Sequence, residues 1–203
     1  MARTPKNLGD FFEASLEKIQ NSGCPTSVVD CFAFQKAQVI EEAGKMEFEN
    51  KELPFLPVIP LGFLGLCPAE QMKMIKIAGK KGAVRIPETV RDNGGNSANK
   101  FPYFCFGVAV KLSGAMKLLD VQREILNAER KLSCLAEAIA VCILYPDILE
   151  RNSVAALGSR CATLAPEISA EDGAPVLEYI LPEYAYDHCR VVSCASRACY
   201  FEF

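Results

Sequence analysis

The residues whose side chains could catalyse a reaction or bind a ligand lie mostly in the last quarter of the chain. Ser159-Arg160-Cys161 is followed by His188, by Cys194 and by Arg197. A cysteine beside an arginine or an imidazole has a lowered pKa and can act as a nucleophile. His188 is the only histidine, so every histidine-dependent mechanism must use it. The candidate catalytic pair is therefore Cys161 or Cys194 with His188.

The same segment can bind a ligand without catalysing a reaction. Guanidinium groups match carboxylates and phosphates in a bidentate way, which makes Arg160 and Arg197, with Ser159, the candidate ligand-binding residues. No complete acid–base or nucleophile set accompanies them, so binding of a small anionic ligand or a partner is the leading interpretation. The thiol- or histidine-dependent enzyme remains the alternative. A structural reading also stays open, in which the arginines pair with internal carboxylates and the cysteines fill the core.

The sequence predicts neither a metal site in this segment nor a cofactor. The pool of ligands would be Cys161, His188, Cys189, Cys194 and Cys199. Steps of five residues place successive strand side chains on opposite faces, and the close ligand pairs typical of structural zinc sites are absent.

Several short strands must bring these groups together. Residues 154–157, 176–180 and 190–194 have strand composition, and residues 103–112 form the longest apolar and aromatic run, which predicts a central strand. If the strands near 154–158 and 190–194 are neighbours, Cys161 and Cys194 approach one side of His188. A helix is predicted over about 133–144, with Ser133 as its N-cap.

The N-terminal third reads as helical. Apolar spacing predicts one helix over 8–19, ending before Gly23, and a second over 28–43, so that the two form a hairpin. Residues 72–86 are ambiguous between a continued helix and a β-hairpin that turns at 79–82. The hairpin is favoured because two glycines bracket two polar residues there.

This order of elements predicts an α+β fold with a small, mainly antiparallel sheet. Its 203 residues are enough for one core, so we expect a single domain over 1–203. Residues 1–50 would be a helical extension packed on an α+β body at 53–203.

Charge and composition limit the partners. Half of the residues are apolar and the formal net charge is −3, which excludes a disordered tail and a basic nucleic-acid coat. Residues 71–100 hold seven basic side chains against two acidic ones, but aromatic residues are sparse among them. A solvated face is therefore favoured there over a nucleic-acid site.

We expect a cytoplasmic protein. The first residues lack the apolar run of a signal peptide, and the apolar stretches 53–66 and 135–144 are too short to span a bilayer. The ten cysteines include no CxxC pair, which is typical of reduced, mostly buried thiols. The apolar residues 199–203 can dock on their own domain or on a neighbour, so a structural homo-oligomer is a third alternative.

Four segments resemble an uncharacterised bacterial family, domain-of-unknown-function family 5701. They are Leu53-Pro54-Phe55-Leu56-Pro57-Val58-Ile59-Pro60, Tyr145-Pro146-Asp147-Ile148-Leu149-Glu150-Arg151-Asn152, Leu157-Gly158-Ser159-Arg160-Cys161 and Ser193-Cys194-Ala195-Ser196-Arg197. The resemblance covers roughly residues 53–197 and implies one domain, but it brings no reaction, cofactor or catalytic residue. The family is usually tryptophan-rich between the third and fourth segments, whereas this chain has no tryptophan.

Overall fold

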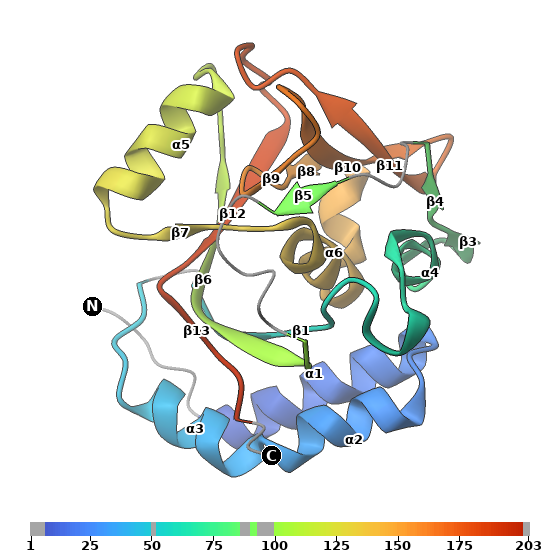
Figure 1. Ribbon diagram of the computed structural model, residues 1–203, viewed down its shortest axis with the longest axis vertical. Coiled ribbons are helices and arrows are strands. Elements are labelled where there is room, and N and C mark those ends of the chain that lie inside the picture. The colour runs from blue at the N-terminus through green and yellow to red at the C-terminus, as the bar shows by residue number, and fades with distance from the viewer. Residues whose placement is uncertain (1–6, 50–51, 86–89, 93–99, 201–203) are drawn as a thin grey trace.

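A nine-stranded mixed sheet with helices on both faces organises the chain in a computed structural model, which describes residues 7–49, 52–85, 90–92 and 100–200 (Figure 1). The strand order is β1-β6-β12-β8-β10-β11-β4, with β13 paired to β6 and β7 paired to β12. These strands are β1 Leu53–Val58, β4 Ala83–Val84, β6 Tyr103–Leu112, β7 Lys131–Leu132, β8 Ser153–Ala155, β10 Ala165–Glu171, β11 Ala174–Ile180, β12 Cys189–Cys194 and β13 Ser196–Ala198.

Two small sheets and the helices complete the fold. The small sheets pair β2 Lys76–Ile77 with β3 Lys80–Lys81, and β5 Arg91–Asp92 with β9 Ser159–Arg160. The helices are α1 Leu8–Ser22, α2 Thr26–Phe34, α3 Lys36–Gly44, α4 Pro68–Met72, α5 Leu118–Asn127 and α6 Leu135–Leu144, with 3₁₀ turns η1 Phe63–Gly65 and η2 Pro146–Glu150.

The α+β class is confirmed and the sheet is mostly antiparallel, as expected, but with nine strands it is not small. Two of its pairings, β12 with β8 and β11 with β4, are parallel. The predicted strands at 103–112, 154–157, 176–180 and 190–194 correspond to β6, β8, β11 and β12. Strands of two or three residues such as β4 and β7 carry too little pattern to be detected from sequence, which is why the sheet was underestimated.

The N-terminal region holds three helices instead of a hairpin of two. Helix α1 is capped by Asn7, whose Oδ1 accepts from the Asp10 amide, and it ends at Gly23 in the left-handed region. The predicted second helix is divided into α2 and α3 at Gln35. The buried Gln35 side chain donates to the carbonyls of Cys31 and Pro102, which ties this break to the start of β6. Tertiary hydrogen bonds therefore override the continuous helical pattern.

The ambiguous segment 72–86 forms a reversal, as favoured, but two residues earlier than predicted. Ile77 pairs with Lys80, and Ala78 and Gly79 both have positive φ values of 47° and 80°. Ala83 and the following residue then leave the hairpin and pair with β11. Ile86 lies outside the described residues.

Helix α6 is the buried centre of the molecule (Figure 1). Every residue from Leu135 to Leu144 is buried, between the sheet and α1. Its N-cap is Cys134 and not the predicted Ser133, whose backbone N–H instead pairs with Val192. The side chain of Glu137 turns back and accepts from the Cys134 amide at 2.9 Å, in the manner of a capping box.

The two faces of the sheet bury separate clusters. The larger cluster joins α1–α4, α6 and one face of the sheet, and it includes Ile168, Leu177 and Cys194. The smaller cluster packs Leu118, Val121 and Ile125 of α5 against the opposite face, and its sheet residues are Ala155, Leu157, Ala165, Ile180, Cys189 and Val191. Helix α5 covers only part of that second face, which leaves room for polar side chains beside it.

The cysteines and the C-terminal segment behave as structural residues. All ten cysteines are free; six are buried and four are half-buried. Tyr200 donates its backbone N–H to Gln35, and the Cys199 thiol lies 3.6 Å from the Pro102 carbonyl oxygen, so the segment to Tyr200 docks on its own domain. None of the helices in the described ranges has the length and apolarity that a bilayer crossing requires.

Candidate functional site

Arg197, one of the predicted ligand-binding residues, is fully engaged inside the protein. Its Nε lies 2.5 Å from Glu137 Oε1, and one terminal nitrogen lies 2.8 Å from Oε2 and 2.6 Å from the Leu132 carbonyl. The side chains of Arg197 and Glu137 are 5% and 1% exposed. This guanidinium is therefore held by an internal carboxylate and not offered to a ligand.

Other donors complete a cluster around Glu137, which we call the Glu137 cluster. The Tyr103 hydroxyl donates to Oε1 at 3.0 Å and the Cys105 thiol at 3.2 Å. Burial raises the pKa of both Tyr103 and Cys105, and the charge of Glu137 raises it further, so both groups stay protonated as donors. Burial alone would lower the pKa of Arg197, but the hydrogen bonds and charge of Glu137 outweigh it and raise the pKa.

The Glu137 cluster also has the residue types of a metal site, but its carboxylate oxygens are already engaged. Ligand atoms of Cys105, Glu137 and Cys194 lie within 4.8 Å of one another. Both Glu137 oxygens, however, already accept from Arg197, and a cation would have to displace that guanidinium. The cluster is built as a buried ion pair.

Ser159 and Arg160 are likewise used by the fold. The Ser159 hydroxyl accepts from the Leu135 amide at 2.8 Å, at the first turn of α6. Arg160 donates to the carbonyls of Leu157 and Ser159 at 2.7 and 2.9 Å, and to Gln122 Oε1 of α5 at 2.7 Å. The three predicted ligand-binding residues thus reach three different internal partners and do not form one anion site.

The predicted catalytic residues are also separated. Strands β8 and β12 are neighbours, as expected, yet Cys194 belongs to the larger core cluster whereas His188 is exposed and lines a pocket on the other face. Cys161 is not among the residues that line that pocket, and it contacts Tyr179. The cysteine that follows His188 in the sequence is Cys189, and burial together with the charge of Glu167 raises the pKa of its thiol to about 12. That thiol is protonated at neutral pH and is a poor nucleophile.

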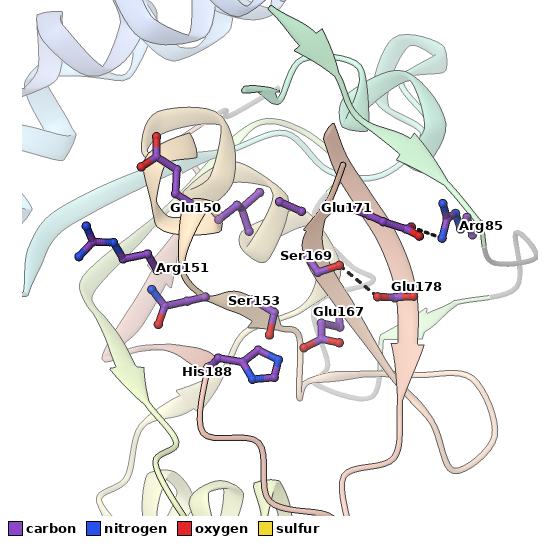
Figure 2. Close-up of a pocket in the computed structure, with 12 residues that line it drawn as sticks. Arg85, Glu150, Arg151, Ser153, Glu167, Ser169, Glu171, Glu178 and His188 are labelled. Carbon is purple, nitrogen blue, oxygen red and sulfur yellow. Dashed lines mark hydrogen bonds and ion pairs between the residues drawn. The ribbon is translucent and has the colours of Figure 1, made fainter. Parts of the chain in front are cut away.

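His188 does belong to a pocket of about 490 Å³, which we call the Glu167 pocket (Figure 2). The lining is mainly polar and comes from β8, β10, β11, η2 and the residue before β12. Its residues are Arg85, Leu149, Glu150, Arg151, Asn152, Ser153, Glu167, Ser169, Ala170, Glu171, Glu178 and His188. This volume lies within the range for small-molecule sites.

A hairpin and a parallel pairing place the polar residues of this pocket. Asp172 and Gly173, with φ values of 51° and 71°, form the turn between β10 and β11, as a two-residue hairpin turn requires. The register sets Glu167 directly opposite Glu178, so both side chains leave the same face of the sheet. The Ser153 amide donates to the His188 carbonyl at 3.0 Å, which holds the histidine beside β8.

Glu167 is the unusual group of the pocket, because it is 5% exposed and lacks an arginine or lysine partner in the described part of the chain. Burial raises the pKa of the Glu167 carboxyl, and the charge of Glu178 adds to this; Ser153, His188 and Cys189 act in the opposite direction. A buried carboxyl with a raised pKa is a common feature of functional sites.

Two enclosed oxygen atoms of the pocket make no hydrogen bond of normal length and angle among the described residues, although Ser153 and Cys189 lie close enough to the Glu167 carboxyl to lower its pKa. The two atoms are Glu167 Oε1 and Ser153 Oγ, from side chains that are 5% and 1% exposed. In Figure 2 these side chains and the His188 ring lie close together and face one another. Native proteins leave few buried polar atoms unsatisfied, so such a pair requires an explanation.

Charged side chains at the margin of the pocket are paired with neighbouring groups or point away from its interior. Arg85 forms an ion pair with Glu171, and Ser169 Oγ donates to Glu178 Oε1 at 3.1 Å. The Arg151 side chain points away from Glu167 in Figure 2. Among the described residues, the carboxyls that face the interior without a lysine or arginine partner are therefore Glu167 and Glu178.

Sequence reasoning missed Glu167 because it missed β10. The segment 165–171 contains a proline and two glutamates, and strands are depleted in both. One signal was present: Asp172-Gly173 between two segments of equal length is a strong hairpin indicator. It would have paired 165–171 with 174–180 and placed Glu167 opposite Glu178.

Comparisons with protein-family models, with curated proteins and with solved structures found no match to this chain. The resemblance to the bacterial family therefore stays a prediction.

Proposed function

We propose that this chain binds a small polar molecule in the Glu167 pocket. The observation that supports this most directly is the pair of enclosed, unsatisfied oxygens, Glu167 Oε1 and Ser153 Oγ, in a pocket of molecular size. Leaving a buried polar group without a partner costs about 1–3 kcal/mol. A ligand that enters the pocket and donates a hydrogen bond to the Glu167 carboxyl recovers part of that free energy on binding.

The proposed function is still binding and not catalysis, as the sequence indicates, but the site is the Glu167 pocket and not the predicted residues Ser159, Arg160 and Arg197. Ser159, Arg160 and Arg197 are occupied by internal partners, so their side chains give no support to an anion site. The Cys189 thiol stays protonated, and no cysteine is among the described residues that line the pocket, so this lining offers no activated sulfur nucleophile. A cytoplasmic setting, inferred from ten free cysteines, is part of the same proposal.

The test is a nuclear magnetic resonance titration of ¹⁵N-labelled protein with small polar probes. A panel of diamines, diols, diamides and dicarboxylates with four to eight non-hydrogen atoms covers the relevant chemistry. We expect at least one class to shift the amide signals of Ser153, Glu167 and His188 together.

A pocket-filling variant gives the control. Ser169→Tyr places a ring in the pocket from a half-buried strand position, and it should abolish those shifts while the amides of α1–α3 keep their positions. If no class shifts the pocket amides, or if the shifts survive in Ser169→Tyr, the pocket is not a binding site.

A further inference from the structure

The Glu167 pocket also indicates the charge of its ligand. Among the described residues, four carboxyl groups line it, against two guanidinium groups. Arg85 is paired with Glu171, and the side chains of Arg151 and Glu150 point away from Glu167 (Figure 2). What remains toward the interior is the pair Glu167 and Glu178, so the interior of the pocket is complementary to positive charge.

The arrangement of these two carboxyls fits an organic cation. As directly opposed residues on antiparallel strands, their Cβ atoms are about 5 Å apart. An ammonium group has three N–H donors and a guanidinium group has five, enough to donate to both carboxyls at once. The hydrogen bond from Ser169 orients Glu178 for this.

A bare metal ion fits less well. Metal ions need several ligand atoms that converge on one point. Among the described residues, the only set of three or more such side chains within 4.8 Å is Cys105, Glu137 and Cys194, and it includes no group of the pocket. The pocket carboxyls are spread over a space of about 490 Å³, which suits a molecule with a body.

We propose that the ligand is an organic cation bearing an ammonium or guanidinium group, which binds Glu167 and Glu178 and drives the proton of the Glu167 carboxyl into solvent. This deepens the proposed function and rests on it. In the empty pocket the buried carboxyl keeps its proton more readily than an exposed one does. A cation beside it favours the carboxylate, so binding and proton release are linked.

The groups that face Glu167 set the conditions of the test. The titratable and polar neighbours come from each element packed around it: Ser153 of β8, Glu178 of β11, Tyr186 and His188 before β12, and Cys189 of β12. Because the charge of His188 acts on Glu167, the contribution of His188 must be separated from that of Glu167.

The probe is 1,4-diaminobutane, with 1,4-butanediol and succinate as the neutral and anionic analogues of similar length. Binding to the full chain is measured by ¹⁵N amide shifts at pH 5, 6, 7 and 8. Aliphatic amines stay protonated throughout this range, so the probe itself does not titrate. We expect the diamine to bind at least tenfold more tightly than the diol, with an affinity that rises with pH until Glu167 is ionised in the empty pocket.

Three variants assign the effect. Glu167→Gln should weaken the diamine about tenfold or more, since a charged hydrogen bond is lost, and should remove the pH dependence. His188→Asn should keep that dependence. Glu183→Gln, at an exposed carboxyl outside the pocket, should behave as the wild type.

The outcomes separate the two proposals. If the diol or succinate binds the pocket as tightly as the diamine, the cation inference is wrong, whereas small-molecule binding stands. A pH dependence that survives in Glu167→Gln also overturns the inference. If no class of the wider panel binds, both proposals fail.

Discussion

Two glutamates, Glu137 and Glu167, are buried to nearly the same extent in this molecule and have opposite surroundings. Glu137 is 1% exposed and accepts from Arg197, Tyr103, Cys105 and the Cys134 amide. Glu167 is 5% exposed, borders a pocket and has an oxygen without a partner in the part of the chain described.

The difference shows that burial alone does not identify a functional carboxylate. A buried charge is tolerated when its partner and its hydrogen bonds are complete, and the Glu137 cluster meets that condition. It joins α6, β6 and β13, three elements that are far apart in the sequence. The Glu167 carboxyl lacks such a partner, and the pocket in front of it can hold a molecule that would supply one.

The largest effect should follow from breaking the buried ion pair of Arg197 and Glu137. Arg197→Leu leaves the Glu137 charge buried without its cation, which we expect to destabilise the fold by about 3–5 kcal/mol. Urea unfolding followed by circular dichroism measures the loss. Arg123→Leu, which removes an exposed ion pair with Asp120, is the matched control and should cost less than about 1 kcal/mol.

A double-mutant cycle sharpens this prediction. Glu137→Leu combined with Arg197→Leu removes both charges, so the double variant should lose less stability than the sum of the two single variants. Strict additivity would mean that the two side chains do not interact in solution, and the comparison between the two glutamates would collapse.

Tyr103→Phe should have a smaller effect on the same cluster. It deletes one hydrogen bond of 3.0 Å to Glu137 Oε1 and keeps the ring in place. Because the bond goes to a charged group, we expect a loss of about 1.5 kcal/mol in the free energy of unfolding. A change below about 0.5 kcal/mol in urea unfolding would show that the remaining donors suffice.

Glu167→Gln should stabilise the fold at high pH, in contrast to the destabilising substitutions in the Glu137 cluster. The folded-state pKa of Glu167 is raised, so its contribution to stability is full below the unfolded pKa and is lost as pH rises through the folded pKa. Gln does not titrate, so the variant should match the wild type near pH 4. At pH 8, where the wild type must bury a charged carboxylate, the variant should melt at a higher temperature than the wild type.

Scanning calorimetry at pH 4, 6 and 8 measures this difference, and Glu183→Gln serves as the exposed control. If the melting temperatures of Glu167→Gln and the wild type differ by the same amount at all three values, the carboxyl is not strained by burial.

The sequence predicted local structure better than it predicted the site. Helix α1, strand β6 and strand β12 follow from apolar spacing and β-branched composition. The partners of Arg160 and Arg197 do not, because Gln122 and Glu137 are 38 and 60 residues away and the contacts depend on how α5 and α6 pack. Residue type showed that these arginines need an acceptor, and only the fold shows that the acceptor is internal.

The smallest effect is expected at the margin of the Glu167 pocket. The ion pair of Arg85 and Glu171 joins side chains that are 55% and 51% exposed, where solvent screens the attraction. Arg85→Ala should therefore change the free energy of unfolding by less than about 1 kcal/mol, and by still less in 1 M salt. The same change frees the Glu171 charge beside the pocket, so the affinity for 1,4-diaminobutane should rise at low salt. A weaker affinity would mean that the ligand is drawn to Arg85, and the carboxyls of the pocket would then lose their assigned role.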